Sequence, residues 1–347
     1  MKALTRTMEK INKRSKGSRT LVLSVIASLE KRRNPLETGG LCGALFMLRC
    51  DRIPVMLNLL TSVILRADSI GECAAMATQK EKADCFRKLH DGPGPFVIPN
   101  PWDVGSARIL AGLGFQALAT SSAAAANAVG RRDHGLTRDE MLAHARLIVG
   151  ATDLPVSADL GNGFGDSPEV VAKTIRLAAN VGLVGCTIED ATGDGARPLY
   201  DFQLAVDRIT AAVEAARALP FPFVLTARAH NFLYADPRLD DTISRLQAFE
   251  KAGADVLFAP GLPDLAVVRA VCSALSKPFN FMVGIKAKSF SVAELAAAGV
   301  RRISLATSLY RAAMTGLLDA AREVSTGQFG FVERSVTTPE LNTLMHI

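Results

Sequence analysis

Charged side chains stand at the ends of several short apolar segments of this 347-residue sequence. Asp159 ends one such segment, just before a glycine-rich turn, and Glu189 and Arg228 end the next two. Carboxylates that share a buried site repel one another unless a cation neutralises them. Oxygen ligands suit Mg²⁺ or Mn²⁺, and the guanidinium fork of an arginine suits a carboxylate or an oxyanion. These residue types therefore predict a metal-assisted site for a small acid.

Further candidate residues follow other apolar segments or lie in the loops after them. In chain order they are Asn100, Trp102, Asp103, Thr120, Ser121, Ser122, Asp133, Asp190 and His230. Asp133 and Asp190 could instead cap loops, and turn formation alone could explain Asp159. Arg228 could be the buried ion-pair partner of Glu189, which is compatible with a structural or a chemical role.

One pattern, a short apolar segment followed by a loop and a helix-period segment, recurs from residue 96 onward. The apolar segments are 96–99, 117–121, 155–159, 184–189, 223–228, 256–259, 279–283 and 302–306. The helical segments are 106–113, 138–149, 168–181, 202–218, 241–252, 265–275, 292–298 and 308–324, after a first helix at 79–89. Continuous apolar strands indicate burial on both faces, as in a parallel sheet.

Eight strands that alternate with eight helices predict an α/β fold of the (β/α)8 TIM-barrel type. The alternative, a doubly wound open sheet, would need a glycine-rich turn where Pro99-Asn-Pro101 stands. In a barrel, the loops at the carboxyl ends of the strands hold the active site. Asp159, Glu189 and Arg228 would then end the third, fourth and fifth strands, so we expect their side chains to meet at one rim.

Charge divides the chain into unequal parts. Residues 1–75 hold 13 Lys and Arg against 6 Asp and Glu, whereas residues 76–347 hold 27 against 28. We expect 1–75 to be a basic N-terminal extension outside the folded enzyme, a targeting segment or an accessory arm. Residues 76–325 would form the catalytic barrel, and 326–347 a C-terminal tail.

The composition also limits the partners. A neutral body argues against a nucleic-acid surface. The most apolar part of the front, 41–65, is interrupted by Arg49, Asp51 and Arg52, so no membrane span is expected. Six cysteines are scattered without a Cys-x-x-Cys pair, which favours a reduced, cytoplasmic setting.

Six short motifs follow one another between residues 96 and 261. They are Phe96-Val-Ile-Pro-Asn-Pro-Trp-Asp103, Thr120-Ser-Ser122, Ser157-Ala-Asp-Leu-Gly-Asn-Gly-Phe-Gly165, Thr187-Ile-Glu-Asp190, Thr226-Ala-Arg228 and Leu257-Phe-Ala-Pro-Gly261. In this order they make residues 76–325 resemble the phosphoenolpyruvate mutase/isocitrate lyase superfamily, most closely its small phosphonomutase-like branch. The resemblance implies a phosphoenolpyruvate-binding barrel that exchanges its last helix with a neighbour, in a homodimer or tetramer. It also implies Mg²⁺ and a carboxylic acid substrate with a 2-oxo acid or enolpyruvate core.

The resemblance further implies roles for individual residues. Asp159 matches the carboxylate that binds the metal most directly, and Glu189 and Asp133 match acids that hold it mostly through water. Arg228 matches the arginine that contacts the substrate and its leaving group. The segment that binds the substrate carboxylate through backbone N–H groups and hydroxyls corresponds to Thr120, Ser121 and Ser122.

The sequence departs from the family pattern in three places. Gly161 stands where a second acid usually follows the metal aspartate, and His230 where an acid usually follows the arginine. The loop 191–197 has no cysteine, which disfavours isocitrate and methylisocitrate cleavage, and it lacks the lysine and asparagine of true phosphoenolpyruvate mutases. His230, with Trp102 and Asp103 of the first motif, remains a candidate substrate-binding residue.

The leading hypothesis is a Mg²⁺-dependent lyase, with Mn²⁺ as an alternative metal, that acts on a small 2-oxo or 2-hydroxy dicarboxylic acid. Phosphonopyruvate hydrolysis or phosphonomutase chemistry is the alternative within the family. A Schiff-base aldolase would use Lys286, just beyond the seventh strand. A barrel that binds a small acid without turning it over is the non-enzymatic alternative, because Gly161 removes an acid from the metal site.

A chain shortened to begin at Met76 tests the domain division. We expect it to be as soluble and as active as the full chain, because the repeating pattern begins after this point. Circular dichroism and activity, measured on both proteins, check this. Loss of folding on truncation would show that residues 1–75 belong to the catalytic domain.

Overall fold

The computed structural model describes residues 77–234, 237–286 and 288–345. These all belong to one of the two units into which the chain divides, residues 70–347. The predicted basic extension 1–75 lies outside the described residues, so its role stays a prediction.

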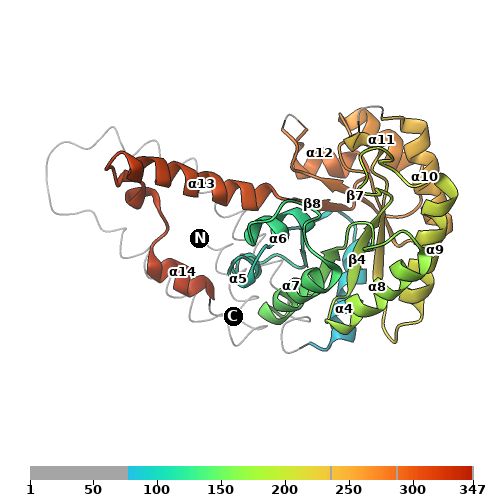
Figure 1. Ribbon diagram of the computed structural model, residues 1–347, viewed down its shortest axis with the longest axis horizontal. Helices are drawn as coiled ribbons and strands as arrows, with labels where there is room; N and C mark the ends of the chain where they lie inside the picture. The colour runs from blue at the N-terminus through green and yellow to red at the C-terminus, as the bar shows by residue number, and fades with distance from the viewer. Residues whose placement is uncertain (1–76, 235–236, 287, 346–347) are drawn as a thin grey trace, which may run out of the picture. The chain divides into compact units, whose positions relative to one another are not determined.

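Eight parallel strands form one sheet that nearly closes on itself (Figure 1). They are β1 (Phe96–Ile98), β2 (Leu118–Ala119), β3 (Val156–Asp159), β4 (Gly185–Glu189), β5 (Val224–Arg228), β6 (Val256–Phe258), β7 (Phe279–Met282) and β8 (Arg302–Ser304). Neighbouring strands follow chain order around the sheet, and β8 pairs with β1. Between β1 and β2 the backbone N–H of Ala119 donates to the carbonyl of Pro99 at 3.0 Å. The predicted barrel is confirmed.

Helices alternate with these strands. They are α4 (Gln79–His90), α5 (Val104–Gly112), α6 (Ser122–Ala128), α7 (Arg138–Ala151), α8 (Pro168–Asn180), α9 (Phe202–Arg217), α10 (Leu239–Lys251), α11 (Leu265–Ser273), α12 (Val292–Ala297), α13 (Ser308–Ser325) and α14 (Thr338–Met345), with short 3₁₀ turns at Asn231–Leu233 and Gly330–Arg334. Several begin at side-chain caps that the sequence supplies, such as Thr137 and Ser291, whose hydroxyls accept the N–H three residues on. The sequence pattern missed α6, α14 and both 3₁₀ turns.

The helix α4 closes the amino end of the barrel. Its Phe86 is fully buried in a small apolar cluster with Phe96 and Val224. Gly185 of β4 permits this approach, because a Cβ there would stand 3.0 Å from the Phe86 ring and 2.7 Å from a backbone oxygen. Among the described residues, the amino end of the barrel is therefore covered by α4.

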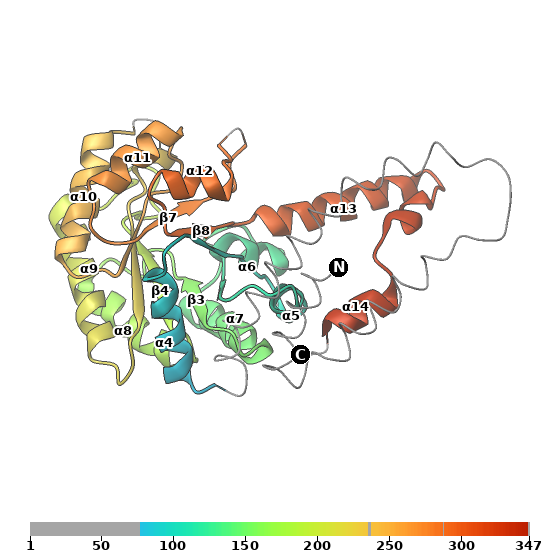
Figure 2. The same ribbon diagram turned by 180° about the vertical axis from the view of Figure 1, so that it is seen from behind.

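The last predicted barrel helix, α13, does not pack on the sheet. It runs away from the barrel (Figure 2), and none of its residues is buried. The predicted tail, 326–347, then turns back, and Leu344 and Met345 of α14 lie near Gly112 and Gly105 of α5. In the part of the chain that the structure describes, α13 thus does not occupy the place of an eighth helix beside the strands.

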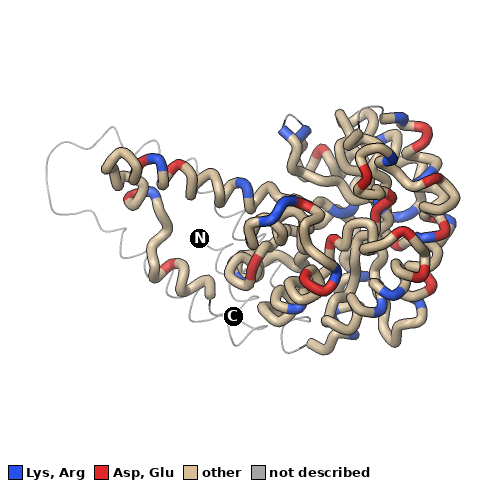
Figure 3. The backbone as a smooth tube through the Cα atoms, in the orientation of Figure 1, with Lys and Arg blue, Asp and Glu red and all other residues tan. Residues whose placement is uncertain are grey.

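Charged residues of both signs are interspersed over the barrel (Figure 3). This agrees with the near-zero balance of residues 76–347. Among the helices that the structure describes, none combines the length and the apolar character that crossing a membrane requires.

Candidate functional site

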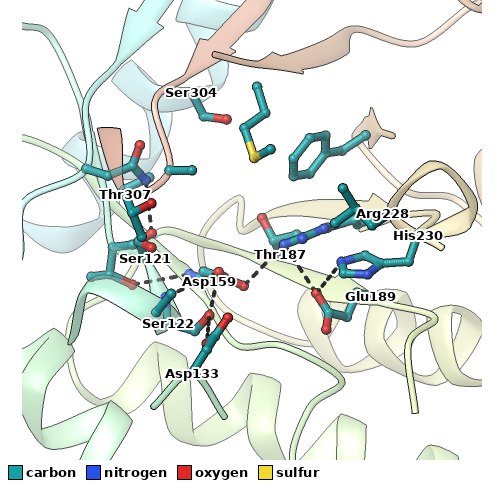
Figure 4. Close-up of a pocket in the computed structure, with 18 of the residues that line it drawn as sticks. Ser121, Ser122, Asp133, Asp159, Thr187, Glu189, Arg228, His230, Ser304 and Thr307 are labelled. Atoms are coloured by element: carbon teal, nitrogen blue, oxygen red, sulfur yellow. Dashed lines mark hydrogen bonds and ion pairs between the residues drawn. The ribbon is translucent and has the colours of Figure 1, made fainter. Parts of the chain in front are cut away.

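A cavity of about 370 Å³ lies at the carboxyl ends of the strands. The residues that line it and that the sequence singled out are Asn100, Thr120, Ser121, Ser122, Asp133, Asp159, Glu189, Arg228 and His230. Figure 4 shows most of these side chains turned toward one another across the cavity. The structure therefore brings to one place residues that are up to 130 positions apart in the chain.

Trp102 and Asp103 do not line this cavity. The chain turns into α5 at this point, and Asp103 caps the helix by accepting the N–H of Ser106 at 2.6 Å. The Trp102 ring packs edge-on against Tyr310 of α13, with ring centroids 5.5 Å apart. Their predicted contact with substrate has no support from these positions and stays a prediction.

Arg228 joins the acids that end β3 and β4. Its Nη1 lies 3.2 Å from Oε2 of Glu189 and 3.9 Å from Oδ1 of Asp159. The guanidinium also lies over the Phe258 ring, 5.0 Å from its centroid. The ion pairs and the contact with the Phe258 ring together fix the guanidinium of Arg228 at the wall of the cavity.

Glu189 is charged in this setting although only 3% of its side chain is exposed. Burial alone raises its pKa, but the positive charge of Arg228 and the contact with His230 outweigh burial and lower the pKa to about 2. His230 Nε2 lies 3.0 Å from Oε2, and Oε1 is buried with no hydrogen-bond partner among the described residues. A buried, ionised oxygen with free lone pairs is able to accept from a ligand or a water.

Ser122 links the other two acids. Its hydroxyl lies 3.0 Å from Oδ2 of Asp159 and 3.1 Å from Oδ1 of Asp133, and its backbone N–H donates to the same Asp159 oxygen at 3.2 Å. A hydroxyl has one hydrogen, so it satisfies only one of the two carboxylates at a time. The carboxylate oxygen that does not receive this hydrogen remains available to a cation or to water.

The acidic residues fit a hydrated divalent cation better than a dehydrated one. Among the residues that the structure describes, no three His, Cys, Asp or Glu side chains gather closely enough to hold a metal by themselves. Mg²⁺ keeps several waters and needs only one or two carboxylates. Asp159 is the acid best placed to bind it directly, since Asp133 approaches from one side through Ser122 and Glu189 from the other across Arg228.

Asp190, the neighbour of Glu189, has a structural role. Its carboxylate accepts the backbone N–H of His230 at 2.8 Å and the Arg245 guanidinium at 3.1 Å. Burial raises the pKa of Asp190, and the charge of Arg245 opposes this. Asp190 does not line the cavity; it fixes the backbone that presents His230.

Several cavity residues were not among the predicted site residues. They are Ala119, Ala123, His134, Thr187, Leu233, Tyr234, Phe258, Met282, Arg302, Ser304, Ala306 and Thr307. The sequence could have indicated Arg302, because it is a charged residue at the start of a predicted buried strand. Lys286, the alternative Schiff-base nucleophile, is exposed and does not line the cavity.

Known proteins resemble this chain in sequence and in fold. The family described as phosphoenolpyruvate phosphomutase matches residues 86–325. A crystal structure of a candidate lyase/mutase from Burkholderia cenocepacia J2315 is 51% identical, with a TM-score of 0.76, over 78% of this chain and 98% of that protein.

Two curated enzymes are also similar. Oxaloacetate decarboxylase of Pseudomonas paraeruginosa (strain DSM 24068 / PA7) is 30% identical over 273 residues, which are 77% of this chain and 92% of that enzyme. The 2-methylisocitrate lyase of Escherichia coli (strain K12) is 34% identical over 201 residues, 56% of this chain and 67% of that enzyme.

The substitution Glu189→Gln tests the buried charge. The folded-state pKa of Glu189 lies below the ordinary 4.5, so its charge stabilises the fold fully above about pH 5 and progressively less as the pH falls toward 2. We expect Glu189→Gln to lower the free energy of unfolding by about 3 kcal/mol at pH 7 and by less at pH 3. Urea unfolding at both pH values measures it, with the exposed Glu214→Gln as matched control. A loss of equal size at both pH values would contradict the assignment.

Proposed function

The chain belongs to the phosphoenolpyruvate phosphomutase family, within the phosphoenolpyruvate mutase/isocitrate lyase superfamily, and we propose that it is a Mg²⁺-dependent lyase. Its relatives are lyases and mutases, so it is an enzyme of this type. The proposed reaction breaks a C–C bond of a small 2-oxo or 2-hydroxy acid. The observation behind the proposal is the meeting of Asp159, Glu189 and Arg228 at one cavity.

The chemistry of such a cleavage suits these residues. A bond that breaks beside a carbonyl leaves an electron pair that must be delocalised onto the carbonyl oxygen as an enolate. Bound Mg²⁺ would supply positive charge near that oxygen. The other fragment leaves without that electron pair, for example as neutral CO₂ from a carboxylate. Arg228, at the cavity wall beside Asp159 and Glu189, would face the oxyanion that develops on the substrate.

The segment after β2 would orient the substrate. Thr120, Ser121 and Ser122 all line the cavity, and Thr120 Oγ1 accepts the backbone N–H of Asp159 at 3.2 Å. This contact fixes the position of the segment relative to Asp159. A carboxylate held here would be fixed relative to Asp159, which sets the plane of the bond that breaks.

Among substrates, a small dicarboxylic acid with a 2-oxo or 2-hydroxy group has the strongest support. The oxaloacetate decarboxylase relative is matched over nearly its whole length. The likeness to 2-methylisocitrate lyase covers 56% of this chain, and the loop 191–197 offers no thiol to protonate the enolate. We therefore favour decarboxylation of oxaloacetate or cleavage of a substituted malate.

A second candidate is cleavage or migration at a P–C bond of phosphonopyruvate. The name of the matching family, phosphoenolpyruvate phosphomutase, favours it. The same enolate would form when the phosphonyl group departs, and Arg228 would hold that group. The absence of the lysine and asparagine from loop 191–197 ranks this candidate second.

We also propose that α13 is exchanged between copies of the chain. Its apolar residues Leu317, Leu318 and Val324 are 60%, 54% and 47% exposed. An exposed apolar helix of this length is costly in water, and packing against a second copy would bury it.

The change Asp159→Ala tests the metal-dependent reaction. We expect Mg²⁺-dependent pyruvate release from oxaloacetate, phosphonopyruvate or alkylmalates by the native enzyme. Asp159→Ala should lower it at least 100-fold while circular dichroism stays unchanged, because the acid best placed for the cation is lost. The exposed Asp153→Ala is the control. Retained activity would remove Asp159 from the metal site, and turnover that ignores EDTA would refute metal dependence.

The double change Leu317→Lys and Leu318→Lys tests the helix exchange. The native protein should sediment as a dimer or tetramer in analytical ultracentrifugation, and the double variant should shift to monomer. Leu147→Lys, equally exposed on α7, should keep the native oligomer. A monomeric native protein at micromolar concentration would reject the exchange.

A further inference from the structure

The floor of the cavity contains a second arginine that the proposed reaction has not used. Arg302 begins β8, and Ser304, two residues further toward the carboxyl rim, lines the same cavity. Arg302 therefore lies deeper in the barrel than the acids of the rim. It is 2% exposed, so its charge is almost completely removed from bulk water.

The side chain is oriented by neutral groups. Arg302 Nε donates to Oδ1 of Asn280 at 2.8 Å, and Asn280 Nδ2 donates to the Ser304 hydroxyl at 3.0 Å. Arg302 Nη1 is buried and has no hydrogen-bond partner among the described residues. The network thus fixes one edge of the guanidinium and leaves a donor on it unused.

No carboxylate balances this charge. Within the described part of the chain Arg302 makes no ion pair with Asp or Glu, and burial lowers its pKa to about 9, opposed only by the Cys186 thiol. His90 is nearby, but burial first, and then Arg302 itself, lower the pKa of His90 to about 3. The imidazole is therefore uncharged at physiological pH, and Arg302 gains no counter-charge from it.

Arg228 differs from Arg302 in this respect. Arg228 is already paired with Glu189 and approaches Asp159. A buried cation without a counter-charge destabilises a fold, so its presence at a cavity floor is best explained by a charge that arrives with the ligand. An arginine fork is suited to a carboxylate.

We propose that Arg302 binds the second carboxylate of a dicarboxylic substrate and so selects dicarboxylic over monocarboxylic 2-oxo and 2-hydroxy acids. The identification of that ligand as substrate rests on the proposed function; the carboxylate site at Arg302 does not. One carboxylate of the acid would be held near Thr120–Ser122 at the rim and the other at the floor.

Binding, rather than turnover, tests the site. Malate and lactate differ chiefly in the second carboxylate, and each is titrated by calorimetry into the full-length protein with MgCl₂ present. Arg302→Met should weaken malate binding at least about tenfold, the loss of one charged hydrogen bond, and change lactate binding less than about threefold. Arg302→Lys should restore part of the malate affinity. Arg301→Met, the adjacent residue on the same chain segment, should leave both ligands unchanged.

Thermal unfolding without ligand separates this role from a structural one. Removing an uncompensated buried charge should leave the Tm of Arg302→Met equal to or above that of the native protein. The proposal would be overturned if Arg302→Met had a lower Tm than the native protein and Arg302→Lys had the native ratio of malate affinity to lactate affinity. Arg302 would then have a structural role. Equal loss of malate and lactate in Arg302→Met, or no malate binding by the native protein, would also overturn the proposal.

Parallel turnover assays keep the two proposals distinct. Arg302-dependent malate binding without any lyase or mutase turnover would uphold the carboxylate site and refute the proposed function. The opposite outcome is that the protein turns over oxaloacetate and that Arg302→Met discriminates between malate and lactate as the native protein does. This would refute the carboxylate site and uphold the proposed function.

Discussion

The balance of charge at the carboxyl rim of the barrel is the constraint on which the site depends. Asp133, Asp159 and Glu189 line one cavity, and acids that share a site repel one another unless positive charge accompanies them. Arg228 supplies part of that charge to Glu189 and Asp159. In the proposed function, the remaining negative charge would attract a divalent ion, and the same arrangement would stabilise an enolate.

The groups behind the rim keep this balance in place. Asp190 and Arg245, both buried, form an ion pair that holds the backbone of His230. His230 in turn contacts Glu189. At the position where the family resemblance implied an acid, this chain thus has a ring that is positioned through its main chain. The ring adds no negative charge and is a polar group against Glu189.

A second departure has a similar effect at Gly161. Its φ of +53° is one that an L-residue adopts reluctantly, and its N–H donates to Asp159 at 3.3 Å. The backbone here contacts the acid directly, at the position where the family resemblance implied a second carboxylate. Arg302, which has no acidic partner among the described residues, adds positive charge at the floor of the same cavity. At the carboxylate site proposed for Arg302, an anionic ligand would reach both ends of the cavity.

The eight strands and the charged residues at the ends of three of them could be predicted from the sequence alone, because burial on both faces produces continuous apolar segments. The sequence also located Asp159, Glu189 and Arg228, since a charged residue at the end of such a segment is conspicuous. The separate roles of Glu189 and Asp190 became visible only in three dimensions: Glu189 ends β4 and lines the cavity, whereas Asp190, the next residue, accepts hydrogen bonds from the His230 backbone and from Arg245. The tertiary structure alone placed Trp102 outside the cavity and Arg302 at its floor, and it alone turned α13 away from the sheet. Those outcomes depend on which distant groups lie close in space, and a linear pattern of polarity does not contain that information.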